Sequence, residues 1–292
     1  MESFIKLFTF IKSVFVISLS QFLTLFAVFF FFGLLLYLLA RFTRVVFVKS
    51  IGTKFDIYIT GWIGTPVHEI GHAVFCIIFG HKIVDMKLFH PNNSDGSLGY
   101  VNHSYNSRNP WHQIGNFFIG FGPIILGSII IMILSIYLIP NNDFLSHFSN
   151  SKTFDLKTLT GIKDQFIQLV NSGKHVSHSL FVQENLQSWE FWLFIYLTVC
   201  VASHMELSPP DIKGLLSGLI YIFILFFVIN TVGQILNINM STYLLSINKY
   251  SHWLVDSFSI ASICSSMFFV FSFIILNIYT LIRYHTFFQP IA

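Results

Sequence analysis

Residues 57–83 read IYITGWIGTPVHEIGHAVFCIIFGHKI, a mostly apolar stretch that contains HEIGH at positions 68–72. His68 and His72 are four residues apart, so on a helix both imidazoles lie on one face and can reach the same metal ion. Glu69, beside the first histidine, is then placed to take a proton from a water on that metal. The stretch therefore predicts a helix with two metal ligands and the general base of a hydrolase.

The HExxH pattern is expected only rarely by chance. Random placement of the histidines and glutamates of this chain would give the pattern in roughly one chain in a hundred. The structural alternative is a partly buried helix with one polar face. Polar and charged side chains in lipid are costly unless they pair or bind a ligand, and this cost favours a functional site.

The composition indicates a membrane protein. Hydrophobic residues make up 54% of the chain and charged residues 10%, whereas soluble domains carry about 25% charged residues. The mean hydropathy is +0.71. We therefore expect an integral, multi-pass protein in contact with the lipid bilayer. The net charge of +3 is small and scattered, so no nucleic-acid partner is expected. Cys76, Cys200 and Cys264 lie far apart in apolar segments and are interpreted as small buried residues.

Six stretches come close to the roughly 20 apolar residues that a spanning helix needs. They cover residues 14–40, 57–80, 113–139, 189–207, 213–236 and 258–282. The fourth is the shortest. The expected fold is thus all-α and polytopic, with about six transmembrane helices. The first run is too long for the apolar region of a signal peptide and is interpreted as a retained helix. The basic residues of the short loop after it favour an external N-terminus.

The segments between the spans carry weaker signals. Ser94–Ser97 gives turn signals and Leu98–Val101 a strand-like piece, which predicts a small β-hairpin or loop between the second and third spans. Apolar residues recur at nearly helical spacing over Phe154–Val170, which predicts an amphipathic helix within the loop 141–188, and Asn239–Ser257 is a less regular counterpart. Four histidines of the first loop are interpreted as solvated rather than ligating: His81, His90, His103 and His112.

These spans and loops group into three regions. Residues 1–56 form an N-terminal transmembrane helix with its loop. Residues 57–236 form a core that holds the HEIGH span and the three spans that follow. Residues 237–292 form an interfacial segment and the last helix.

Catalytic zinc needs a third protein ligand, and the best candidate is Asp211, directly after Pro209 and Pro210. Two prolines break a helix, and the exposed backbone can hold a carboxylate at membrane depth beside protein or water. Asp211 could equally be the N-terminal cap of the fifth span. Weaker candidates are His204 and Glu206 at the end of the fourth span, Glu190 at its start, and Cys76 one helical turn after the second histidine.

The chain resembles the site-2 protease family of intramembrane zinc metalloproteases. The resemblance rests on HEIGH in the second span, Gly122-Pro123 in the third, and Pro209-Pro210-Asp211 after the fourth. It implies a three-helix core, one zinc per chain bound by His68, His72 and Asp211, and Glu69 as general base. It also implies a membrane-anchored protein substrate, and a short sheet near residues 81–111 that could pair with an unwound segment of it. Ile212 stands where the family usually has glycine.

Two alternatives remain open at this stage. One is a different HExxH membrane protease that takes a glutamate, here Glu190 or Glu206, as third ligand. The other is a membrane scaffold that keeps a metal site without turnover, a pseudo-protease. The presence of Glu69, which is not needed for metal binding, favours activity.

Overall fold

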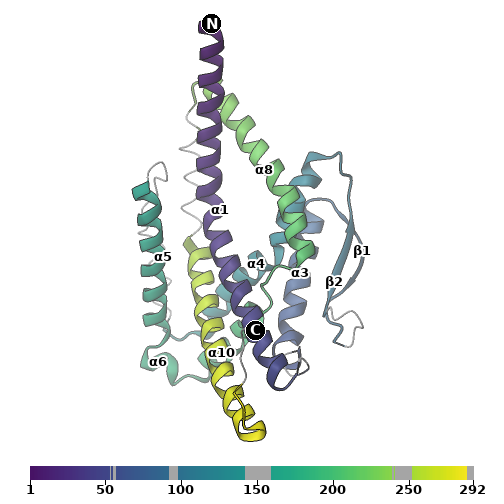
Figure 1. Ribbon diagram of the computed structural model, residues 1–292, viewed down its shortest axis with the longest axis vertical. Coiled ribbons are helices and arrows are strands. Elements are labelled where there is room, and N and C mark those ends of the chain that lie inside the picture. Colours follow the sequence, from purple (N-terminus) through teal and green to yellow (C-terminus); the bar gives the residue numbers. More distant parts are fainter. Residues whose placement is uncertain are drawn as a thin grey trace.

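The computed structural model describes residues 1–52, 54, 57–91, 98–141, 159–238, 240 and 252–287. It is mostly helical with one small sheet (Figure 1). The N-terminal half contains α1 (Glu2–Ser50), the π-helical turn η1 (Ile57–Gly61), α3 (Trp62–Ile78), β1 (Lys82–Lys87), β2 (Tyr100–Ser104) and α4 (Pro110–Leu138). The C-terminal half contains α5 (Leu159–Leu180), α6 (Gln183–Leu186), α7 (Trp189–Ala202), α8 (Pro209–Ile235) and α10 (His252–Tyr284).

Four of these helices are long and apolar enough to cross a membrane, judged by length and composition: α1, α4, α8 and α10 from Val255 onward. The two other predicted spans fall on shorter helices. The stretch 57–80 holds η1 followed directly by the 17 residues of α3. The stretch 189–207 holds the 14 residues of α7, which ends at Ala202. The predicted helical, apolar character is therefore confirmed for the residues described.

Polar caps set the starts of the helices that build the site. The Asn109 side chain accepts a hydrogen bond from the Trp111 backbone N–H at the start of α4, and Pro110 occupies the first turn. Ser208 caps α8 in the same way, with Pro209 following it. Side-chain oxygens at these positions satisfy N–H groups that have no partner within the helix, and proline lacks the N–H that would otherwise be orphaned. The cap at Ser208 places Asp211 in the first turn of α8.

Glycines let α4 pack closely between α3 and α8. A Cβ atom on Gly71 would lie 2.7 Å from the carbonyl carbon of Gly122, so α3 and α4 cross at these two residues. A Cβ atom on Gly120 would lie 2.7 Å from the Asp211 carbonyl oxygen on α8. Gly122 packs against α3, whereas Gly120 makes room for α8, because the two residues lie on different faces of α4.

The predicted small sheet is present as an antiparallel pair, with Lys87 opposite Tyr100 and Ile83 opposite His103. It stands beside α3, on the side of the molecule opposite α5 (Figure 1). The predicted turn at 94–97 lies outside the described residues. The first part of the predicted amphipathic helix and most of the stretch 239–257 also lie outside the described residues. The rest of the amphipathic helix belongs to α5, which is described from Leu159 onward.

A buried polar cluster ties α1 to α8. The side-chain amides of Gln21 and Asn230 hydrogen-bond to each other in both directions, at 3.2 and 2.6 Å. The Asn230 amide also donates to the Ser18 hydroxyl at 3.1 Å. Such bonds hold apolar helices together where the hydrophobic effect cannot discriminate between protein and lipid. They fix the position of α8, whose first turn contains Asp211.

Candidate metal centre

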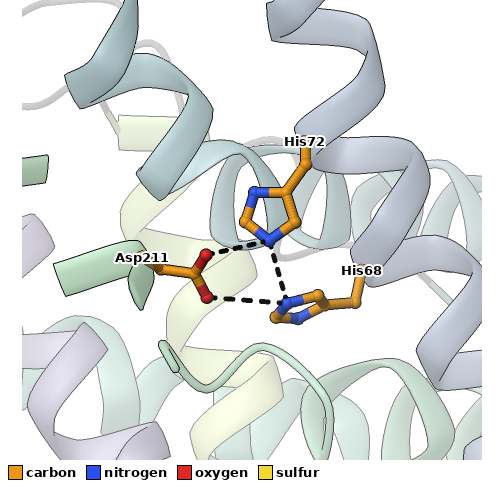
Figure 2. Close-up of side chains that lie close together, drawn as sticks. All are labelled: His68, His72 and Asp211. Carbon is orange, nitrogen blue, oxygen red and sulfur yellow. Dashed lines mark hydrogen bonds and ion pairs between the residues drawn. The ribbon is translucent and has the colours of Figure 1, made fainter. Parts of the chain in front are cut away.

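The side chains of His68, His72 and Asp211 converge from two helices (Figure 2). The Nε2 atoms of the two histidines are 3.1 Å apart. Oδ1 of Asp211 lies 3.3 Å from Nε2 of His72, and Oδ2 of Asp211 lies 3.9 Å from Nε2 of His68. A tetrahedral zinc with bonds of about 2.0–2.1 Å holds its ligand atoms about 3.3 Å apart. Two imidazoles and a carboxylate at these separations fit zinc in both donor type and spacing.

A proline in α4 orients the His72 ring. Pro123 has no backbone N–H, so the carbonyl of Ile119, four residues earlier, has no helical donor. The structure gives this carbonyl another partner, the Nδ1–H group of His72 at 2.7 Å. The bond fixes the tautomer of His72 with its Nε2 lone pair toward the cluster, as a hydrogen bond from the other ring nitrogen does in metal-binding histidines.

The His68 ring is oriented by the chain between α7 and α8. α7 ends at Ala202, so the His204 carbonyl lies outside the helix. It accepts a hydrogen bond from Nδ1–H of His68 at 2.6 Å. Both histidines therefore present Nε2 to the same point, and in each case a backbone carbonyl determines which nitrogen carries the proton.

Asp211 caps α8 and also faces the two histidines. Its Oδ2 atom accepts hydrogen bonds from the backbone N–H of Ser208 at 2.9 Å and from the Ser208 hydroxyl at 2.6 Å. The Ser208 hydroxyl in turn accepts from the Asp211 N–H, which completes a capping box. Oδ1 is left facing His72. The cap thus holds the carboxylate in the orientation that ligation would need.

Three of the other third-ligand candidates are engaged elsewhere, and the fourth, Cys76, is a buried free cysteine. Glu206 forms an ion pair with Arg44 at 2.5 Å. Glu190 bonds to the Ser188 hydroxyl at the start of α7. The His204 ring lies with Nδ1 3.2 Å from the Cys200 carbonyl oxygen. Among the described residues, the two HEIGH histidines and Asp211 form the one group of three suited to a metal ion.

Glu69 lies beside the cluster and close to Gly99, at the end of the strand pair. Its side chain is almost fully buried, with 6% of the residue exposed. Gly99, just before β2, lies so close that a Cβ atom there would be 2.9 Å from Oε1 of Glu69. A glycine is required for this approach because any side chain would meet the carboxylate and the Lys87 carbonyl oxygen, which is equally near. Gly99 therefore covers Glu69, the only acid within α3.

The loop histidines are organised differently from our expectation. We interpreted His81 as solvated, but only 5% of it is exposed. Its Nε2–H donates to the His112 carbonyl at 2.9 Å, so its Nδ1 accepts from Nδ1–H of His103 at 3.0 Å. Burial lowers the pKa of His81, and burial together with the neighbouring His81 lowers the pKa of His103. Both rings are therefore neutral at pH 7, and they join the sheet to the end of α3.

No protein-family model, curated protein or solved structure matches this chain. The site itself holds three convergent groups suited to a metal ion, two histidines oriented by backbone carbonyls, and a buried glutamate next to them.

The role of Pro123 gives a specific prediction. Pro123→Ala restores an N–H that competes with His72 for the Ile119 carbonyl. We therefore expect zinc affinity to fall by about 10–100-fold, the range for loss of a hydrogen bond that orients a metal ligand. Pro110→Ala is the matched control, because a proline in the first helical turn frees no carbonyl that the site uses. Zinc affinity is measured by competition with a chromophoric chelator. Equal affinities of the two variants would contradict the role of the proline.

Proposed function

We propose that this protein is an intramembrane zinc endopeptidase that resembles the site-2 protease family and cleaves membrane-anchored proteins. The observation that carries the proposal is the convergence of His68, His72 and Asp211 at zinc-ligand spacing, with Glu69 buried beside them. α3, α4 and α8 would form the three-helix core of such an enzyme. The two shorter apolar helices, α3 and α7, would complete six spans of a multi-pass integral membrane protein.

The chemistry follows from the residues present. Zinc held by three protein ligands keeps a fourth position for water and lowers the pKa of that water to about 7. Glu69 is the only acid of α3, and it would accept the proton of the attacking water and return it to the leaving amine. Asp211, already bound by the Ser208 N–H and hydroxyl, would serve as ligand and not as base.

A substrate helix must unwind to be cleaved, because its carbonyls are hydrogen-bonded within the helix and its backbone groups need new partners in lipid. The two-stranded sheet offers such partners. Each of its strands pairs on one side only within the described residues, and an extended peptide can add to a free edge. Since Gly99 touches Glu69, a segment paired with this sheet would pass close to the base. Gly or Pro in the substrate would lower the cost of unwinding.

The test uses the purified full-length chain in detergent. We expect about one zinc per chain by mass spectrometry of the metal, and cleavage of a single-span peptide that carries a Gly-Pro pair at its centre and a label at each end. Cleavage should stop when zinc is chelated and return when zinc is added back. Absence of zinc after metal is supplied would overturn the proposal. Bound zinc without cleavage of any such peptide would favour the non-proteolytic scaffold.

A further inference from the structure

His103 lies on β2 and has no part in the proposed metal chemistry. Gly99, just before this strand, faces Glu69, because a Cβ atom on Gly99 would lie 2.9 Å from Oε1 of Glu69. Side chains two residues apart on a strand point to the same side of it, so Val101 and His103 point the same way as Gly99. Both are partly buried, whereas the residue that follows each of them on β2 is exposed. His103 therefore lies on the face of the sheet that is turned toward α3.

His81, which hydrogen-bonds to this side chain, is anchored on the two helices that carry and orient His72. Its backbone N–H donates to the Cys76 carbonyl at 2.8 Å, and Cys76 is one helical turn after His72 on the same face of α3. On α4, a Cβ atom on Gly115 would lie 3.1 Å from Nε2 of His81. Gly115 is one turn before Ile119, whose carbonyl orients His72. The same two helices thus fix the position of the His81 ring.

Hydrogen bonds also determine which nitrogen of His103 carries the proton. Nε2–H of His81 donates to the His112 carbonyl at 2.9 Å, so Nδ1 of His81 accepts from Nδ1–H of His103 at 3.0 Å. Nε2 of His103 is then an unprotonated acceptor, and it has no hydrogen-bond partner among the residues that the structure describes. Burial and His81 lower the pKa of His103, and His72 and Asp211 also act on this pKa. The acceptor is therefore within electrostatic range of the metal cluster.

An acceptor at this position suits a hydroxyl side chain of the substrate. Side chains directly opposite on paired strands are about 4.5–5.5 Å apart on the same face, so a substrate strand added to β2 would place a side chain beside His103. A charged donor would be costly in a half-buried site and is rare in transmembrane segments, whereas serine and threonine occur within them. Four residues along a strand cover about 13 Å, so this side chain would lie about four residues from the one beside Glu69.

We propose that His103 selects substrates with serine or threonine about four residues from the cleaved bond, by accepting a hydrogen bond from that hydroxyl at Nε2. The inference rests on the proposed function and specifies its substrate class. His103 would touch the substrate but not the reacting atoms. His81 would act through His103, as the residue that holds the ring and its proton in place.

The test uses the full-length chain in detergent and the labelled single-span peptides with a central Gly-Pro pair. One threonine is moved along the peptide, and each peptide is paired with one that carries valine, which has nearly the same shape, at that position. We expect kcat/KM to favour threonine about five- to tenfold at one position about four residues from the cut, the effect of one hydrogen bond. The preference should appear mainly in KM, because the contact is made outside the reacting atoms.

His103→Leu should abolish this preference. His103→Gln should restore part of it, because a glutamine amide can donate to His81 while its oxygen accepts from the substrate. The matched control is His178→Leu, which makes the same change in the last turn of α5, on the side of the molecule opposite the sheet (Figure 1). It should keep the wild-type preference. Zinc content is measured in every variant.

Three results would overturn the proposal: equal values for threonine and valine at every position, a preference that survives His103→Leu, or a stronger preference for lysine than for threonine at the same position. Binding of the same peptides to Glu69→Gln, followed by fluorescence anisotropy, tests the contact without cleavage. A threonine preference in binding that depends on His103 would support this proposal even if the wild-type chain cleaved no peptide, a result that would count against the proposed enzyme alone.

Discussion

Glu69→Gln is expected to lower the rate of peptide cleavage by about 10²–10⁴-fold, the range for loss of a general base, while zinc remains at about one per chain. Glutamine has the size and shape of glutamate, so it keeps the packing under Gly99 that the structure shows. It lacks the negative charge and the basicity needed to accept a proton. The metal ligands are His68, His72 and Asp211 in this proposal, so the substitution leaves all three in place.

The measurement is a single-turnover cleavage rate on the labelled single-span peptide, with zinc quantified in the same preparation. Glu190→Gln is the matched control. It makes the same chemical change at the start of α7, where the glutamate bonds to Ser188 and lies outside the metal cluster. Loss of zinc together with activity would make Glu69 a ligand. An unchanged rate would remove it from the chemistry and support a metal-binding scaffold.

The sequence predicted the parts of this structure that depend on local pattern. Long apolar runs predicted α1, α4, α8 and α10, because helix length and hydropathy are properties of a single segment. The spacing of the two histidines placed both on one face of α3 for the same reason. The prolines at 209 and 210 predicted a break in the helix beside Asp211, and α8 does begin there.

The features of the site that could not be predicted from the sequence depend on contacts between segments. Backbone carbonyls carry no residue identity, so the bonds from His68 to His204 and from His72 to Ile119 could not be predicted from residue type. One signal was present, because Pro123 within an apolar helix necessarily frees the carbonyl four residues earlier. That carbonyl needed a donor, and His72 is the donor in the structure.

The burial of His81 was missed for a related reason. Its neighbours in sequence are a glycine and a lysine, which indicate a solvated turn. In the structure it is enclosed by contacts with His103 on β2 and His112 on α4. These two histidines are 22 and 31 positions away in sequence, beyond the reach of any local pattern.

Asp211→Ala should reduce bound zinc from about one per chain to nearly none, because two histidines alone do not complete a three-ligand site. The same change removes the capping box of α8, which costs about 1 kcal/mol of stability. Asp211→Asn separates the two effects. Its side-chain oxygen can still accept the Ser208 N–H, so the helix start is retained, but it has lost the charge that makes the carboxylate a strong ligand. We expect this variant to unfold at nearly the wild-type temperature and to bind zinc poorly.

Glu206→Gln is the control for these two variants, because Glu206 lies in the same segment and the substitution removes the same charge. That charge belongs to the ion pair with Arg44 and not to the metal cluster. It should keep its zinc. Metal content after a chelator wash and the thermal unfolding midpoint are measured for all three variants. If Glu206→Gln loses zinc while Asp211→Asn keeps it, Asp211 is only a helix cap. The enzyme would then belong with HExxH proteases that use a glutamate ligand, and Arg44 would have to release Glu206 for the metal to bind.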